Sequence, residues 1–517
     1  MEYPQARLAT VLIAAVIFVL RVPSYVVHPQ FVAEDGILWL QAYIYGLESL
    51  FLPFVGYLSV APRLIALAAL PFPESYAPAI CFYGTAAVDL FIVWLLTSPR
   101  LDLPFKPLIA LAVFSTGQAS HIIGIAFSAV QWVVPFGAIA LLLMRPSNRQ
   151  AIFVLEIMFL AVVGLTGPFA IFYALPFVIQ AWLLRNDQAQ SKRMAIFAVV
   201  VAGCAALQVL TVFTNLEASL QASRRAEFDP LARWAWAELT NMAMQYIFMP
   251  VGQYVFNGFN GFVAGLFVTS ATITLLMLYI FRSSRYRAHL IYMLMFAGGV
   301  LVSGSIKVGP QERYVYHLGV FIIWFLCCLT DEFARTQVRR ACVAAIAVLE
   351  LLFVAHDFRS ERHKGEREWS RWASVFRSGL PITVPVGPEG WYLNIPADRN
   401  GHLFPMSDWP GKNISAITQV TGTCHGAINS VRRLDEVNYA FVSSRMNSYT
   451  GADPRWMAAG SVDPSIDAIV ISDQSDRVLG FGVAGLRDGW SAVYPARDDK
   501  IKAFGISKDG KVCGFGD

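Results

Sequence analysis

Apolar runs of nearly twenty residues recur along the first two thirds of the chain, with short polar loops between them. A helix needs about 20 apolar residues to cross a bilayer, and it satisfies its backbone hydrogen bonds internally while doing so. The pattern therefore predicts an α-helical polytopic membrane body of about eleven transmembrane helices. The predicted spans are residues 7–25, 76–97, 107–120, 126–144, 151–163, 169–184, 194–213, 260–281, 288–305, 314–330 and 341–355.

Composition supports this interpretation and divides the chain in two. The 517 residues are 56% hydrophobic and only 15% charged, which excludes a water-soluble enzyme. A formal net charge of +4 supplies no concentrated basic face, so we expect no nucleic-acid partner. Residues 1–356 carry 21 Lys/Arg and 17 Asp/Glu, whereas residues 357–517 carry 19 of each in less than half that length. We therefore predict a membrane body over 1–356 and a soluble module over 357–517.

The C-terminal module has the alternating pattern of strands. The segments DAIVIS, RVLGFGVAGL, WSAVYP and IKAFGI are separated by turn sequences such as DQSD and KDG, which predicts a β-rich, sandwich-like domain. Its two cysteines, Cys424 and Cys513, can form one disulfide in an oxidising compartment, or they can be two unrelated thiols. Six aromatic residues are candidates either for stacking on sugar rings or for core packing: Trp391, Tyr392, Trp409, Trp456, Trp490 and Tyr494.

Basic residues predict the orientation of the body. With a cytoplasmic N-terminus, the inside loops hold fourteen Lys/Arg and the outside loops seven, as the positive-inside rule requires. An odd number of spans then places the C-terminal module in the periplasm. This topology requires that residues 36–71 do not cross the membrane, so we interpret them as two amphipathic helices in the outer interface.

The long first outer loop opens with an acidic pair, Glu34 and Asp35, followed by Gly36. A carboxylate at the lipid–water boundary can accept the proton of an attacking hydroxyl when it lies within hydrogen-bond reach. Asp35 is the candidate general base, and Glu34 is the candidate to orient Asp35 or the acceptor. The alternative interpretation is a helix N-terminus, with Asp35 in the first turn and a purely capping role.

Positive residues near the outer interface are candidates for binding a phosphate. Arg313 offers a planar guanidinium that can contact two phosphate oxygens, and Lys307 and Arg63 are further candidates. Each can instead be a structural, snorkelling cation. The residues predicted to have positioning roles are Glu312, Tyr314, His121 and Gln131. Two more ionisable residues, Asp89 and Glu156, fall inside predicted spans, where they suit either structural hydrogen bonds or a proton pathway.

Several short motifs, taken in order, resemble one family. AEDG at 33–36, QW at 131–132, LTGPF at 165–169, ERY at 312–314 and VGPEGW at 386–391 together resemble the bacterial membrane glycosyltransferases of the GT-C type. More narrowly, the chain looks like the branch that modifies O-antigen and other cell-envelope glycans. The likeness extends over nearly the whole membrane body.

The resemblance implies an activity, a location and partners. It implies an inverting transfer of a sugar from a polyprenyl-phosphate donor to a lipid-linked or polysaccharide acceptor, on the periplasmic face of the bacterial inner membrane. An acidic residue of the first outer loop would be the base. The tandem DxD-like pattern of some relatives is absent, so no metal ligands are expected and dependence on a divalent metal stays open. Two other classes remain as alternatives: a membrane transporter or lipid-linked glycan flippase, and, third, a periplasmic O-acyltransferase.

Overall fold

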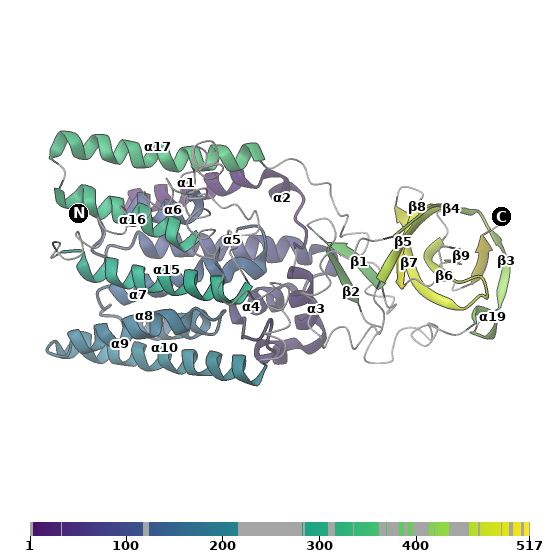
Figure 1. The fold of residues 1–517 in the computed structure, drawn as a ribbon, viewed down its shortest axis with the longest axis horizontal. Coiled ribbons are helices and arrows are strands. Elements are labelled where there is room, and N and C mark those ends of the chain that lie inside the picture. The colour runs from purple at the N-terminus through teal and green to yellow at the C-terminus, as the bar shows by residue number, and fades with distance from the viewer. Residues whose placement is uncertain are drawn as a thin grey trace. The chain divides into compact units, whose positions relative to one another are not determined.

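The fold is that of a computed structural model (Figure 1). It describes residues 4–215 apart from 33 and 117–123. It also describes residues 282 and 285–360 apart from 309–315 and 334, Trp369, and residues 382–515 apart from 387–390, 396–412, 418, 434–453, 464–465, 487–488, 496–499 and 508–510.

Helices make up most of the described part of the chain. The first series is α1 (Pro4–Arg21), α2 (Pro23–Val27), α3 (Asp35–Tyr45), α4 (Val60–Ala69), α5 (Ala77–Leu96), α6 (Lys106–Ser115), α7 (Val134–Leu143), α8 (Gln150–Gly164), α9 (Ala170–Leu183) and α10 (Gln188–Thr214). Three 3₁₀ helices lie among them: η1 (Gly46–Phe51), η2 (Glu74–Tyr76) and η3 (Phe127–Trp132). The second series is α15 (Arg287–Val308), α16 (Tyr316–Phe333) and α17 (Thr336–Ser360).

Three of these helical segments are long and apolar enough to cross a membrane: Pro4–Arg21, Glu74–Leu96 and Gln190–Thr214. This indicates a membrane protein. A helix lies at each predicted span within the described residues, but several are short; α6, for example, has 10 residues and is about 15 Å long, half of the bilayer core. The predicted span at 260–281 lies outside the described residues.

The chain forms two compact units. One comprises Met1–Val27, Leu50–Ile65 and Phe82–Lys364; the other comprises His28–Ser49, Ala66–Cys81 and Gly365–Asp517. The sequence predicts a single division after residue 356. In the structure the first unit extends to Lys364, and two pieces of the first predicted outer loop, His28–Ser49 and Ala66–Cys81, belong to the same unit as the C-terminal module.

The strands of the C-terminal module form a hairpin and one larger sheet. Strands β1 (Ile382–Val386) and β2 (Trp391–Ile395) pair antiparallel. The larger sheet has eight strands in the order β3-β10-β9-β6-β7-β8-β5-β4. Their bounds are β3 (Val420–Cys424), β4 (Gly426–Arg433), β5 (Pro454–Val462), β6 (Ile466–Ser472), β7 (Val478–Leu486), β8 (Gly489–Pro495), β9 (Lys502–Ser507) and β10 (Val512–Phe515); the short helix α19 (Ile414–Ile417) precedes them.

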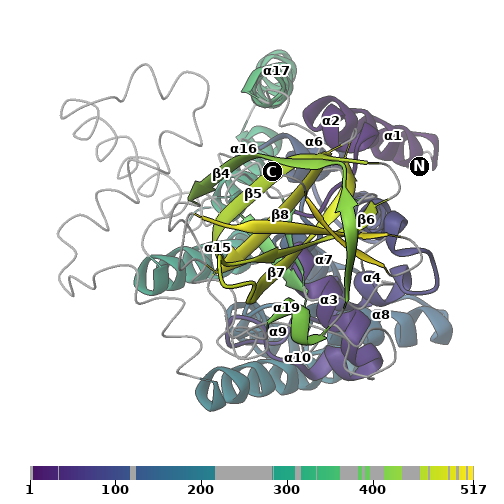
Figure 2. The ribbon, with the colours of Figure 1, turned by 90° about the vertical axis from the view of Figure 1, so that its right-hand side faces the viewer.

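The order of the strands shows how this sheet closes. The edge strands β3 and β4 are consecutive in the chain, with only His425 between them, so the sheet must curl until the end of β3 adjoins the start of β4 (Figure 1). Figure 2, turned by 90°, shows the neighbouring strands β4, β5, β8 and β7 of this sheet. The predicted β-rich module is confirmed. The prediction of a sandwich with two facing sheets is wrong for the described strands, because all eight strands from β3 to β10 belong to one curled sheet.

The interior of the curled sheet is apolar. Buried side chains of β5, β6, β8 and β9 form its core, among them Ile469, Ile471 and Trp490. The Trp490 indole N–H donates to the carbonyl of Ala427 at 3.2 Å, so this tryptophan is a core residue and does not offer its face to a sugar. The side chains of Trp391, Tyr392, Trp409, Trp456 and Tyr494 lie outside the described part. The predicted disulfide is confirmed: Cys424 of β3 and Cys513 of β10 are bonded, with 5.5 Å between their Cα atoms.

Candidate functional site

The acidic pair lies at the start of α3. Asp35 is its first residue and is only 2% exposed. Its Oδ2 accepts the backbone N–H of Val32 at 3.1 Å, and its own backbone N–H donates to the Val32 carbonyl at 3.1 Å. This exchange of bonds resembles half of a capping box, and it places a negative charge at the positive end of the helix. The capping arrangement predicted as the alternative for Asp35 is therefore present in the structure.

Glu34 differs from its neighbour. It occupies the N-cap position of α3, yet its side chain makes no capping hydrogen bond. The residue is partly exposed, whereas Asp35 is buried. Of the two carboxylates, that of Glu34 is therefore the more accessible to an incoming hydroxyl.

An aromatic cluster holds this segment inside the second unit. Trp369 packs edge-on against Phe31, with ring centroids 4.5 Å apart, and against Trp39 of α3 at 5.6 Å. The Trp369 indole N–H donates to the carbonyl of Glu74 at 2.9 Å. One tryptophan thus ties together the residues before the acidic pair, the helix after it and the 66–81 segment. We call Phe31, Trp39 and Trp369 the aromatic anchor.

Two of the sequence motifs meet in the helical unit. Gly167 of the LTGPF turn has a positive φ of 72°, and a Cβ placed there would lie 2.7 Å from Oε1 of Gln131. The Trp132 ring packs edge-on against Phe169 with centroids 5.1 Å apart. The QW and LTGPF motifs, 34 residues apart at Gln131 and Leu165, are therefore neighbours. The Oε1 atom of Gln131 is buried and has no hydrogen-bond partner in the described part of the chain.

His317 joins the same group from α16. It is fully buried, and its Nε2 lies 2.7 Å from the carbonyl of Trp132. A carbonyl can only accept, so Nε2 carries the proton and the ring is fixed against the QW motif. The rings of Phe169 and Phe296 contact the imidazole at 5.5 and 4.8 Å. The sequence predicts no role for His317, because its partner Trp132 lies 185 residues away in the chain.

The LTGPF turn also holds the chain just before α4. Ser59 and Thr166 form an isolated antiparallel bridge, and the Thr166 hydroxyl accepts the N–H of Ala61 at 2.8 Å. This arrangement fixes the start of α4 and, one turn further on, Arg63. Arg63 is fully buried, and its Nη2 donates to the carbonyl of Leu52 at 3.0 Å. The structure therefore gives Arg63 a chain-bracing contact, and a phosphate role for it stays a prediction.

The remaining predicted phosphate and positioning residues are only partly covered. Lys307 is the penultimate residue of α15. Glu312, Arg313, Tyr314 and His121 lie outside the described residues. Across the described ranges, no three His, Cys, Asp or Glu side chains come together as a metal site.

Two of the carboxyls inside predicted spans, those of Glu156 and Asp89, have different surroundings. Glu156 of α8 is bound by two guanidinium groups, Arg100 at 2.6 Å and Arg193 at 3.1 Å. Asp89 of α5 is 1% exposed, and its Oδ1 has no hydrogen-bond partner among the residues that the structure describes. The pairing of Glu156 indicates a structural role for this carboxylate. No such explanation accounts for Asp89.

No model of a known protein family matches the chain, and no curated protein matches it. A function for this protein is therefore inferred from its own residues.

Proposed function

We propose that this protein is a membrane glycosyltransferase with a GT-C-like body of about eleven spans, a cytoplasmic N-terminus and a periplasmic C-terminal module in a bacterial inner membrane. It transfers a sugar from a polyprenyl-phosphate donor to a lipid-linked or polysaccharide acceptor. The observation that supports this most is the location of the acidic pair: it opens a helix that packs, through the aromatic anchor, against the segment leading into the β-rich module. A catalytic loop built into the same unit as a polar domain suits chemistry at the membrane surface.

The proposed reaction needs one base. A carboxylate removes the proton from the acceptor hydroxyl, whose oxygen forms a bond to the anomeric carbon of the donor sugar. The bond from that carbon to the phosphate oxygen breaks, and the polyprenyl phosphate leaves with the electron pair. Attack from the face opposite the phosphate inverts the anomeric centre.

The geometry favours Glu34 as the base and Asp35 as the residue that holds the helix start. Asp35 is buried, and its Oδ2 already accepts the backbone N–H of Val32, so this oxygen is engaged within the chain. Glu34 makes no capping bond and is partly exposed. A general base must be held in a fixed position to act efficiently. The aromatic anchor, whose residues Phe31 and Trp39 flank Glu34 in the chain, would supply this support.

Activity of two isosteric variants tests this division of roles. Membranes containing the full chain are supplied with a panel of radiolabelled polyprenyl-phosphate sugars and lipid-linked glycans. We expect Glu34→Gln to lose about 100- to 10,000-fold in turnover, the usual effect of removing a general base, with an unchanged melting temperature. Asp35→Asn keeps an oxygen that can accept the Val32 N–H, so its turnover should stay near that of the wild type.

The opposite results have distinct meanings. An inactive Asp35→Asn beside an active Glu34→Gln would exchange the roles. Near-normal turnover in both variants would refute the acid-pair mechanism, and a wild type that transfers no sugar from any donor of the panel would refute the proposed function.

The proposed orientation has its own test. The excess of basic residues in the predicted inside loops supports a periplasmic C-terminus. Alkaline phosphatase fused after Asp517 should be active, and a fluorescent protein that matures only in the cytoplasm should stay dark there. The reverse pattern would place the acidic pair on the cytoplasmic side.

A further inference from the structure

The helix α6 ends inside the helical unit. Its last residues, from Val113 to Ser115, are all buried. The final carbonyls of a helix have no partner within it, so a buried end must be capped by other groups. Here the hydroxyl of Tyr316 of α16 donates to the Val113 carbonyl at 2.8 Å, and the guanidinium of Arg21 of α1 donates to the Phe114 carbonyl.

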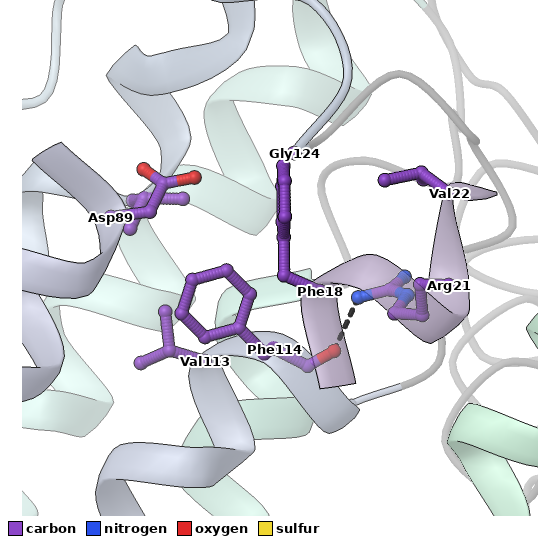
Figure 3. A pocket seen from close by; sticks show the side chains of 8 residues that line it. Phe18, Arg21, Val22, Asp89, Val113, Phe114 and Gly124 are labelled. Atoms are coloured by element: carbon purple, nitrogen blue, oxygen red, sulfur yellow. Dashed lines mark hydrogen bonds between the residues drawn. The ribbon is translucent and has the colours of Figure 1, made fainter. Parts of the chain in front are cut away.

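A small cavity adjoins this helix end. Its lining includes Phe18 and Arg21 of α1, Asp89 of α5, Val113 and Phe114 of α6, and Gly124. In Figure 3, Asp89 and Arg21 lie on opposite sides of the cavity, and the rings of Phe18 and Phe114 stand between them. The wall around Asp89 is therefore largely apolar.

The burial of Asp89 at this position is energetically unfavourable. Its carboxyl is 1% exposed, and Oδ1 has no hydrogen-bond partner within the described ranges. Burying a carboxylate whose Oδ1 lacks a partner in a largely apolar site costs free energy relative to its exposure to water.

Other titratable groups surround the end of α6. Tyr316 of α16 lies within electrostatic range of both Asp89 and Arg21, and Tyr316 and Arg21 bind the carbonyls at the end of α6. Glu350 of α17 is 4% exposed and lies beside Ser115, the last residue of α6. Two carboxyls from different helices thus approach one buried helix end, and one of them lines a cavity.

We propose that the Asp89 cavity is a binding site for one proton, which converts the carboxylate of Asp89 to the carboxylic acid and is released again as the pH rises. A metal cation fits less well. It would need several oxygen ligands, yet Val113 and Phe114 already use their carbonyls and Arg21 brings a positive charge to the same space. This proposal does not depend on the glycosyltransferase activity.

Infrared spectroscopy of the full chain in lipid nanodiscs tests the proposal. A protonated carboxyl has a C=O stretching band that is separate from the amide bands. At neutral pH the wild type should show this band, Asp89→Asn should lose its Asp89 component, and the component should fade as the pH of the wild-type sample is raised. Asp102→Asn is the control, because Asp102 is exposed and ion-paired with Arg285 at 3.5 Å, and this substitution should leave the Asp89 component of the band unchanged.

A second measurement excludes the metal alternative. The melting temperature of the wild type should be the same in sodium chloride and in choline chloride of equal ionic strength. A sodium-specific rise that Asp89→Asn abolishes would overturn the proposal in favour of a metal-cation site. Identical infrared spectra of wild type and Asp89→Asn would overturn it as well. If Asp89→Asn does not fold, Asp89→Glu replaces it: a shifted carboxyl band supports the proposal and an unshifted one refutes it.

Discussion

Removing the Trp369 side chain should release the segment that carries the acidic pair. Trp369 is 5% exposed and packs on Phe31 and Trp39 at 4.5 and 5.6 Å, and its indole N–H donates to Glu74. Truncating a buried tryptophan to alanine costs about 3 to 5 kcal/mol. Each edge-on aromatic pair contributes about 0.5 to 1.5 kcal/mol of this beyond burial, and the hydrogen bond about 1 kcal/mol.

Amide hydrogen exchange measured by mass spectrometry on the protein in nanodiscs can follow this loss. Because about 1.4 kcal/mol is a factor of ten in an equilibrium, Trp369→Ala should speed exchange in α3 by about 100-fold or more. Trp369→Phe keeps an aromatic ring but loses the indole hydrogen bond and part of the buried ring, so exchange in α3 should speed up less than in Trp369→Ala. Trp182→Ala is the matched control, because Trp182 is 61% exposed and should leave α3 unchanged. Wild-type exchange in α3 of Trp369→Ala would show that the aromatic anchor does not hold the acidic pair.

Three further predictions concern stability. Cys513→Ser opens a disulfide that closes an 89-residue separation, so the β module should lose about 4 to 5 kcal/mol in a denaturant titration, and reductant should lower the wild type to the same level. Gly167→Ala should lower stability by about 1 to 2 kcal/mol because of its φ of 72°, whereas Gly203→Ala, with open space around it in α10, should be neutral or stabilising; equal melting temperatures would contradict this. Arg193→Ala removes one of the two guanidinium partners of Glu156 while Arg100 stays at 2.6 Å, so it should destabilise the helical unit by about 1.5 to 3 kcal/mol, the range for a hydrogen bond to a charged group; an unchanged melting temperature would contradict this.

Local patterns predicted most of the secondary structure. The segments DAIVIS and WSAVYP coincide with β6 and β8 almost residue for residue, since alternation and bounding turns are properties of neighbouring residues. The curling of the sheet was not predictable in this way. It depends on β3 and β4 standing at opposite edges, and this order is set by pairings between strands far apart in the sequence.

The end of α6 shows another limit of sequence reasoning. The apolar pattern predicted a span of residues 107–120, but the helix ends at Ser115. Its end is capped by Arg21 and Tyr316, which lie 93 and 203 residues away from the carbonyls they bind. No pattern within the span could reveal these partners.

The acidic pair was found from the sequence, but its internal division of roles was not. Asp35 is buried against its own backbone, and the helix that it opens is held by Trp369 from a part of the chain predicted to be a separate module. From the sequence, Asp35 is the candidate base and Glu34 is the residue that orients it, and the roles proposed from the fold are the reverse. The distinction between Glu34 and Asp35 comes from the aromatic anchor and from the hydrogen bond to Val32, both of which are properties of the folded unit.

Asp89 and Glu156 look equivalent in the sequence, because each is a single carboxyl within an apolar run. The fold separates them. Glu156 lies near the beginning of α8, where Arg100 and Arg193 from other segments reach it at 2.6 and 3.1 Å, so its charge is matched and its presence is explained by the bundle itself. Asp89 borders a small cavity, and the Arg21 guanidinium on the far side of that cavity binds the Phe114 carbonyl; an apolar side chain at position 89 would remove the penalty of burying the carboxyl. A carboxyl at such a costly position suggests that binding and release of its proton have a function. For this reason the infrared band of Asp89 is informative, and that of Glu156 is not.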